Sequence, residues 1–175
     1  MTSTPIETLL QDLNILVVDG NSYMRRMTRM MLLNLGVRSV IEAADGFAAI
    51  EQIRAYNPDV MLLDWNLPAL NGMEVMRIVR SPGVFPCPAL PTIMLTDRPQ
   101  RSDILEALRV GVHEFLLKPT SPKELRDHLI SVVIKPRTMM KIGEYYVPEP
   151  RKMPSAQELE TQPKDLGYRP HGGRV

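Results

Sequence analysis

The segment Val60-Met-Leu-Leu-Asp64 is a short apolar run that stops at a carboxylate, and it is the clearest indication of the fold class of this chain. Four apolar residues are too few for a helix and are typical of a strand that is buried on both faces of a sheet. A second run, Asn14-Ile-Leu-Val-Val18, has the same form and is followed by Asp19. Further apolar runs at 39–43, 92–95 and 115–117 complete a set of five expected strands.

Amphipathic segments lie between and after these runs. Apolar residues at helical spacing, with cap residues before them and Gly or Pro after some of them, predict five helices. The segments are 22–35, 47–57, 73–79, 104–110 and 121–134, and we expect Ser22 and Ser121 to cap the first and the last of them. Strands that alternate with helices indicate an α/β domain of the (βα)5 type, whose doubly wound, five-stranded parallel sheet is covered by helices on both faces.

The composition fits a globular domain and excludes several classes of protein. The chain has 175 residues, of which 44% are hydrophobic, and its net charge of +1 disfavours nucleic-acid binding through overall basicity. We interpret Arg25, Arg26 and Arg29, on the first expected helix, as a solvated face. The one cysteine, Cys87, excludes an internal disulfide framework. No apolar run reaches the roughly 18 residues that span a bilayer, and residues 1–13 lack a signal-peptide pattern, so we expect a cytoplasmic protein.

A change in composition near Lys135 predicts a boundary between two parts of the chain. Residues 135–175 carry six of the 16 prolines and a net charge of +3, whereas residues 1–134 carry a net charge of −2. Residues 135–175 also lack the apolar periodicity of a second core. We expect a domain over 1–134 and a Pro-rich, largely irregular and partly disordered tail over 135–175, with apolar residues gathered near its start.

Polar side chains mark the ends of four expected strands. Asp19, Asp64, Thr96 and Lys118 each stand at, or directly after, the carboxyl end of a strand. These ends meet at one edge of a parallel sheet, which is where open α/β domains bind ligands. Two carboxylates, a hydroxyl and an ammonium can hold a hard cation and a phosphoryl group, and a carboxylate can itself accept the phosphoryl group. One polar residue after a strand is common in any α/β protein, but a set of four is much less so.

Four segments in this order resemble the receiver (CheY-like) domain of two-component response regulators, of the single-domain type with a C-terminal extension. They are Ile15-Leu-Val-Val-Asp19, Asp64-Trp-Asn-Leu-Pro68, Leu95-Thr96 and Phe115-Leu-Leu-Lys118-Pro119. The resemblance covers about residues 10–134 and implies a flavodoxin-like sheet with strand order 2-1-3-4-5.

The resemblance also implies a role for each matching residue. Asp64 would be the phosphoryl acceptor, and Thr96 and Lys118 would bind the phosphoryl group. Mg²⁺ would be held by Asp19, Asp64 and the backbone carbonyl of Asn66. Thr96 and Phe115 would form a conformational switch, in which Thr96 moves inward and the aromatic ring repacks. A cation and a lysine that neutralise developing charge are the main route to catalysis of phosphoryl transfer.

Three residues depart from the pattern of the family. Gly20 stands where the family has a second acid that ligates the metal, so Mg²⁺ would be held more weakly and keep more water. Asp97 follows the family threonine, where a small residue is usual and a carboxylate would repel the phosphoryl group. Phe115 has no hydroxyl and could switch through packing alone.

The resemblance implies a response regulator that takes a phosphoryl group from a histidine kinase or phosphotransfer protein and signals by contact with a downstream protein. We expect no enzymatic activity beyond self-catalysed phosphotransfer and dephosphorylation, no DNA binding and no membrane insertion, and a homodimer stays open. The tail would be dispensable for phosphorylation and needed for a partner contact.

One alternative is a pseudo-receiver that is not phosphorylated because of Gly20 and Asp97. A flavodoxin-like enzyme is disfavoured, since no nucleotide or flavin loop is present.

Overall fold

A five-stranded parallel sheet forms the centre of the protein in a computed structural model, which describes residues 5–81, 83, 85 and 87–150. The strand order is β2-β1-β3-β4-β5, and every neighbouring pair is parallel. The strands are β1 (Asn14–Val18), β2 (Ser39–Ala43), β3 (Val60–Asp64), β4 (Thr92–Thr96) and β5 (Glu114–Leu117). The doubly wound, flavodoxin-like fold predicted from the sequence is therefore confirmed.

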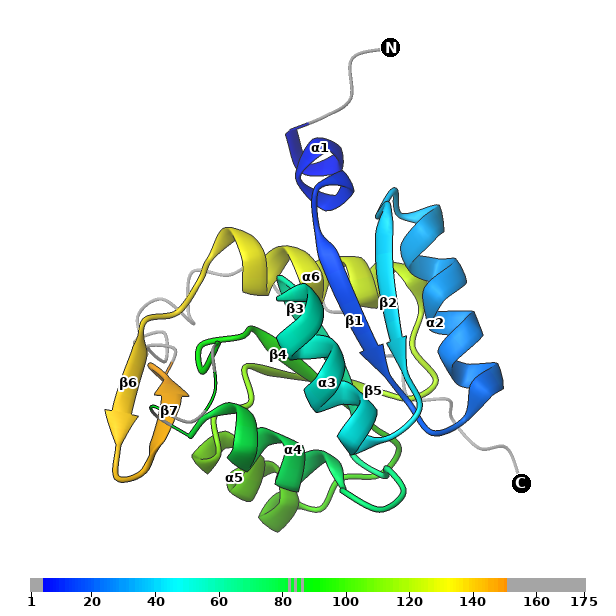
Figure 1. Ribbon diagram of the computed structural model, residues 1–175. Helices are drawn as coiled ribbons and strands as arrows, with labels where there is room; N and C mark the ends of the chain where they lie inside the picture. The colour runs from blue at the N-terminus through cyan, green and yellow to red at the C-terminus, as the bar shows by residue number, and fades with distance from the viewer. Residues whose placement is uncertain (1–4, 82, 84, 86, 151–175) are drawn as a thin grey trace, which may run out of the picture.

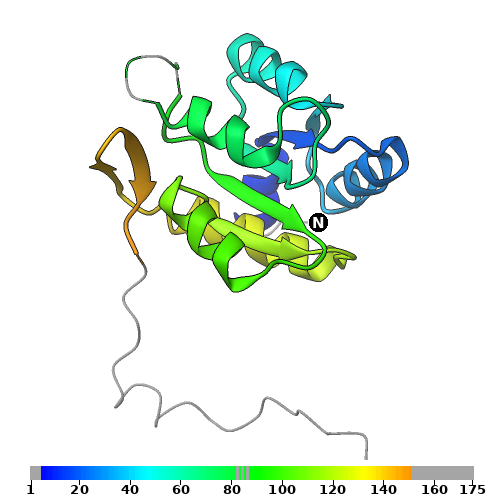
Figure 2. The same ribbon diagram turned by 90° about the horizontal axis from the view of Figure 1, so that it is seen from below.

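Helices cover both faces of this sheet, as Figures 1 and 2 show. They are α1 (Pro5–Gln11), α2 (Ser22–Asn34), α3 (Gly46–Tyr56), α4 (Gly72–Val79), α5 (Arg101–Arg109) and α6 (Pro122–Ile134). Helices α3, α4 and α5 pack in one hydrophobic cluster, and α1, α2 and α6 pack in the other. Strand β3 supplies both clusters, because Met61 and Leu63 face the first and Val60 and Leu62 face the second.

The helix caps explain where two of the helices begin. Ser121 caps α6 as predicted, and its side chain accepts a hydrogen bond from the backbone of Glu124. The predicted cap of α2 is wrong by one residue. Asn21 takes that position, and its side chain accepts hydrogen bonds from the N–H groups of Tyr23 and Met24.

Two short elements were not expected from the sequence. Helix α1 precedes the sheet, and a hairpin of β6 (Met139–Ile142) and β7 (Tyr145–Pro148) follows α6. Gly143, with a φ of 62°, lies in the turn of the hairpin, where a positive φ favours glycine. The hairpin lies at the side of the domain opposite α2 and β2 (Figures 1 and 2). The beginning of the expected tail is therefore folded, while residues 151–175 lie outside the described residues.

A fully buried arginine joins the hairpin to the domain. The guanidinium of Arg80 donates to the backbone carbonyls of Pro88 at 2.8 Å, Leu90 at 2.7 Å and Gly111 at 3.0 Å. The backbone carbonyl of Arg80 accepts a hydrogen bond from the Tyr146 amide. Burial lowers the pKa of Arg80 to about 9, which still leaves the group charged at neutral pH. Arg80 thus connects the loop before β4, the turn before β5 and the hairpin.

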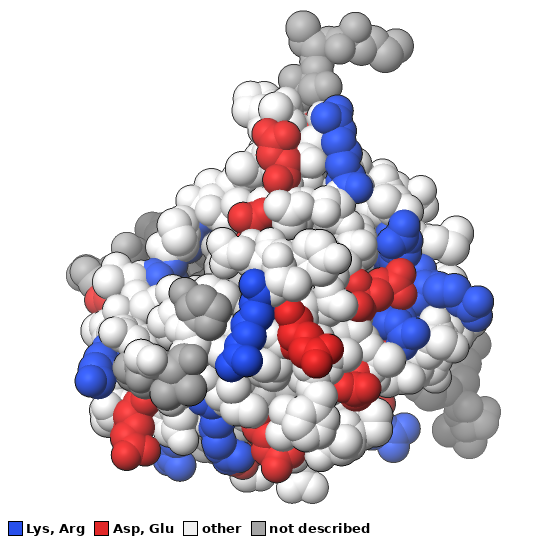
Figure 3. Space-filling view, in the orientation of Figure 1, with Lys and Arg blue, Asp and Glu red and all other residues white. Residues whose placement is uncertain are grey.

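The surface carries both signs of charge. On the face drawn in Figure 3, acidic and basic side chains are interspersed, and neither sign forms a broad patch. Within the described part of the chain, no helix combines the length and the apolar character that a membrane span requires.

Candidate functional site

The carboxyl edge of the sheet brings together the four polar residues that mark the strand ends. Asp19 follows β1, Asp64 and Thr96 end β3 and β4, and Lys118 follows β5. The ammonium nitrogen of Lys118 lies 3.0 Å from Asp19 Oδ2 and 3.1 Å from Asp64 Oδ2. One cation therefore bridges two carboxylates that come from different strands.

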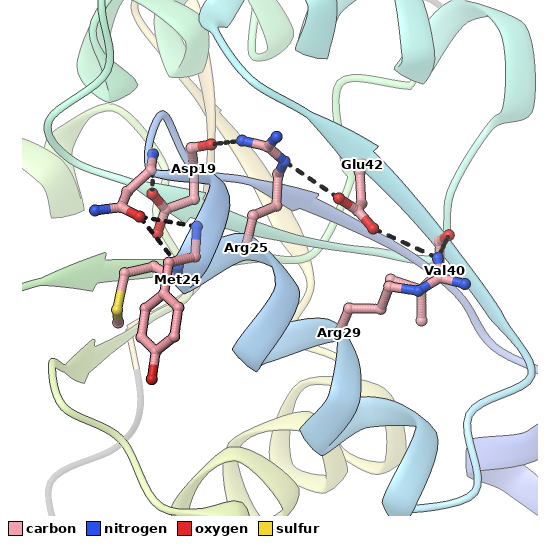
Figure 4. Close-up of polar contacts among 8 residues, drawn as sticks. Asp19, Met24, Arg25, Arg29, Val40 and Glu42 are labelled. Atoms are coloured by element: carbon pink, nitrogen blue, oxygen red, sulfur yellow. Dashed lines mark hydrogen bonds and ion pairs between the residues drawn. The ribbon is translucent and has the colours of Figure 1, made fainter.

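Asp19 is held through every polar group that it has. Its amide donates to the Ala43 carbonyl, its Oδ1 accepts from the Asn21 amide at 2.8 Å and its Oδ2 accepts from Lys118. Its backbone carbonyl accepts from Arg25 Nη1 at 2.7 Å (Figure 4). Since only 1% of Asp19 is exposed, the carboxylate is fixed toward Lys118 and the Asn21 amide rather than turned to solvent.

Asp64 lies beside Asp19 at the end of the central strand. Its Oδ1 accepts a hydrogen bond from the Asn66 amide at 3.2 Å. Burial raises the pKa of the Asp64 carboxyl, and the charge of Asp19 acts in the same direction, while Lys118 opposes both. Burial alone would lower the pKa of Lys118, but the two carboxylates outweigh it and the pKa is raised. Lys118 is therefore an ammonium at neutral pH.

Two neighbouring clefts open at this edge of the sheet. One of about 540 Å³ is lined by Asp19, Gly20, Asn21, Met24, Asp64, Asn66, Pro68, Asp97 and Lys118. The other, of about 600 Å³, is lined by Trp65, Asn66, Thr96, Asp97, Arg98, Asp103 and Lys118. Because Asn66, Asp97 and Lys118 line both clefts, a ligand that fills either one meets the same polar groups.

The side chains at the first cleft fit Mg²⁺ through oxygen atoms. Asp19, Asp64 and Asn66 offer the hard oxygen ligands that this ion prefers. No three His, Cys, Asp or Glu side chains gather as a metal site anywhere in the described ranges. Gly20 has no side chain and so supplies no third acid, and a Cβ atom added there would lie 3.0 Å from Pro68 Cδ and 3.6 Å from the Ala44 carbonyl oxygen. The donor set fits an ion that keeps several of its water ligands.

The remaining expected site residues lie at or near the clefts. Thr96 is buried at the end of β4, beside Lys118, whose amide donates to the Thr96 carbonyl at 2.9 Å. Asp97 is exposed at the mouth of the clefts. Phe115 is partly buried on β5, pairs with Met94 and packs against the hydrophobic cluster on the α3–α5 side.

Arg25 also belongs to the surroundings of the site, and the sequence did not lead us to expect it there. Its interpretation as part of a solvated face is wrong, because the guanidinium binds the Asp19 carbonyl and lies 3.2 Å from Glu42. The side chain is only 17% exposed. The available signal was a basic residue in the first turn of the helix that follows Asp19, together with an acid on the next strand.

Comparison with known proteins identifies the family to which the fold belongs. The family model of the response regulator receiver domain matches residues 15–130. The chain is 37% identical to the chemotaxis protein CheY1 of Helicobacter pylori over 119 residues, which cover 67% of this chain and 94% of that protein. A chemotaxis protein CheY4 structure from Vibrio cholerae superimposes with a TM-score of 0.63 at 30% identity, covering 69% of this chain and 98% of that chain.

A second structural neighbour carries a magnesium ion in its own active-site cleft. It is the receiver domain of a sensor histidine kinase from Pseudomonas aeruginosa, with magnesium coordinated in its active-site cleft. The TM-score is 0.61 at 30% identity, over 67% of this chain and 94% of that chain.

Proposed function

This chain belongs to the response regulator receiver family, and we propose that it accepts a phosphoryl group on Asp64 and signals through protein contact. The donor would be the phosphorylated histidine of a kinase or of a phosphotransfer protein. The observation that carries the proposal is the Lys118 ammonium, which lies within 3.1 Å of both Asp19 and Asp64. A partly buried ammonium at that point can stabilise the oxygens of a phosphoryl group on the neighbouring carboxylate.

In the proposed reaction, a carboxylate oxygen of Asp64 forms a bond to phosphorus. The bond from phosphorus to the donor's histidine nitrogen breaks, and the imidazole, protonated on its other nitrogen, leaves as a neutral ring. Lys118 favours the ionised, nucleophilic form of Asp64 before transfer. It then pairs with the phosphoryl oxygens, while the Thr96 hydroxyl donates a hydrogen bond to them. Water later cleaves the aspartyl phosphate and releases inorganic phosphate.

Asp64 and its neighbours in the first cleft would also hold a metal ion. Asp19, Asp64 and the backbone carbonyl of Asn66 would hold Mg²⁺, which would neutralise charge on the transferring phosphoryl group. With Gly20 in place of an acid, Asp19 is the one carboxylate beside Asp64 in that cleft on the β1 side. Its tight fixation by hydrogen bonds supports its role as a ligand.

The proposed output is a change of shape on the α5, β5 and α6 side. Thr96 ends β4, and Phe115 lies on the neighbouring strand β5. A hydroxyl that moves toward the new phosphoryl group leaves space that the partly buried ring of Phe115 can fill. A downstream protein would then distinguish the two arrangements of this surface.

A pseudo-receiver is the second candidate, and two residues favour it. Gly20 removes an acid from the metal cleft, and the exposed Asp97 places an extra negative charge at both clefts. Like charge at the mouth of the clefts disfavours the approach of a phosphorylated donor. In this case the domain would contact partners without being phosphorylated.

Labelling by acetyl phosphate with Mg²⁺ distinguishes the two candidates. Intact-mass measurement is expected to find one phosphoryl group on the wild-type chain and none on Asp64→Asn, with circular dichroism spectra that agree. Asp97→Asn is the matched control, because it removes a different carboxylate from the same clefts. It is expected to keep the label and to gain it faster. An unlabelled wild-type chain would favour the pseudo-receiver.

A further inference from the structure

Arg25 connects three elements next to the phosphoacceptor site. It lies in the first turn of α2, and its Nη1 donates to the Asp19 carbonyl at the end of β1. Its Nε lies 3.2 Å from Oε2 of Glu42 on β2. Figure 4 shows the guanidinium between these two acceptors. A planar guanidinium that donates in two directions restrains both partners better than a single-point donor would.

The hydrogen bond from Arg25 is accepted by the carbonyl oxygen of the Asp19–Gly20 peptide group. A glycine has more backbone freedom than any other residue, and it loosens the chain on either side of it. Rotation of the Asp19–Gly20 peptide would turn the Asp19 carbonyl, and it would disturb the loop whose next amide, that of Asn21, binds Asp19 Oδ1. The charge-assisted hydrogen bond from Arg25 therefore restrains the Asp19–Gly20 peptide, whose glycine would otherwise allow it to rotate.

We propose that Arg25 is a positioning residue that holds the Asp19–Gly20 peptide, so that the Asp19 carboxylate stays directed at Lys118 and at an incoming cation. The cation part of this inference rests on the proposed function. Arg25 itself touches the backbone of Asp19 and acts through it. In a site that has lost one acid at Gly20, the orientation of the remaining carboxylate decides how well a cation is held.

Arg29 provides a matched control on the same helix. Its Nη1 lies 3.5 Å from Oε1 of the same Glu42 and 3.3 Å from the Val40 carbonyl, and within the described part of the chain no hydrogen bond or ion pair joins it to Asp19 (Figure 4). Arg25→Ala and Arg29→Ala each remove one arginine of α2 and one partner of Glu42. They differ in the bond to the Asp19 carbonyl.

The first measurement needs no metal and follows the amide of Asn21, which binds Asp19 Oδ1. Hydrogen exchange of this amide by NMR is expected to be at least about tenfold faster in Arg25→Ala than in the wild type, the size expected for one lost charge-assisted bond. In Arg29→Ala it is expected to change by less than about twofold, as for a neutral surface substitution. Equal exchange in the two variants would overturn the inference.

The second measurement follows cation binding through Trp65, the only tryptophan of the chain, which neighbours Asp64. Titration with Mg²⁺ is expected to give an affinity about tenfold weaker for Arg25→Ala than for Arg29→Ala, as for the loss of a group that orients a metal ligand. Equal affinities would contradict the role toward the cation. A wild-type chain without any response to Mg²⁺ would count against the proposed function, whereas the exchange of the Asn21 amide would still decide the role of Arg25.

Arg25→Lys tests the same idea if Arg25→Ala does not fold. Lysine keeps the charge and most of the stem, but its ammonium lacks the fork that reaches the Asp19 carbonyl and Glu42 together. Faster exchange of the Asn21 amide in Arg25→Lys than in Arg29→Lys is expected. No difference between these two variants would overturn the inference.

Discussion

The amide of Tyr146 donates a hydrogen bond to the backbone carbonyl of Arg80 at 3.2 Å, and this bond fixes the C-terminal hairpin on the domain. A Cβ atom on Gly111 would lie 2.5 Å from the Tyr146 carbonyl oxygen, so the hairpin lies directly against the turn before β5. The guanidinium of Arg137 also donates to the His113 carbonyl at the start of β5. Residues 139–148 are therefore packed against the domain and form part of its fold.

Truncation after Ile134 is accordingly expected to destabilise the domain. The truncation removes Val147, whose side chain is only 7% exposed. The loss of this one buried side chain costs about 1.5–3 kcal/mol of the free energy of unfolding. The truncation also exposes the surface of the domain against which the hairpin packs. Truncation after Pro150 is the control, since it keeps the hairpin, and it is expected to leave the free energy of unfolding in urea unchanged. Equal stability of the two truncated chains would contradict this expectation. The domain would then end at residue 134, as the sequence predicts.

His113 is expected to make the domain sensitive to acid. Burial lowers the pKa of this imidazole to about 3, and the nearby charges of Arg80 and Arg137 act in the same direction. The unfolded chain takes up the proton near pH 6.5, so the contribution of the neutral ring is full above that pH and is lost progressively as the pH falls toward about 3. Thermal melts of His113→Asn between pH 7 and pH 4 are expected to give a shallower loss of stability than those of the wild type. Parallel pH profiles would rule this origin out.

Gly20→Asp is expected to tighten Mg²⁺ binding and to speed phosphorylation, because it returns a carboxylate to the metal cleft. In the absence of metal it is expected to lower stability, since a third acid would repel Asp19 and Asp64. Gly20→Asn is the matched control, because its Cβ meets the same Pro68 ring at 3.0 Å without adding charge. Titrations that give the same Mg²⁺ affinity for both variants would place Gly20 outside the metal site.

Addition of Mg²⁺ with beryllofluoride, which mimics a phosphorylated aspartate, is expected to move amide resonances well beyond the clefts. Because Thr96 and Phe115 lie on neighbouring strands, the affected amides should include those of residues 98–107 and 111–117. Asp64→Asn should abolish these shifts. Shifts confined to the loops that line the clefts would argue for a pseudo-receiver instead.

The parallel sheet and the four polar residues at its carboxyl edge could be predicted because their signals are local. An apolar run such as Val60–Leu63 identifies a buried strand, and the residue that ends it lies at the sheet edge by geometry alone. Asp19, Asp64 and Lys118 could thus be assigned to one place before their distances were known.

The packing of the hairpin on the domain and the role of Arg25 could not be predicted in the same way, because both depend on contacts between distant residues. Val147 is buried because the hairpin packs against Arg80 and Gly111, which lie far from it in the sequence. From the sequence alone, Arg25 is expected to be a surface residue. Only the pairing of β1 with β2 in the structure places Glu42 beside it. The turn at Gly143 and Glu144, between two short apolar runs, was the local signal for the hairpin.

Chemical trapping of the modified residue shows directly whether Asp64 accepts the phosphoryl group. After incubation with acetyl phosphate and Mg²⁺, borohydride reduces an aspartyl phosphate to homoserine, which mass spectrometry of peptides can locate. Homoserine is expected at position 64 alone. Homoserine at position 19 or 97, or at no position, would contradict it.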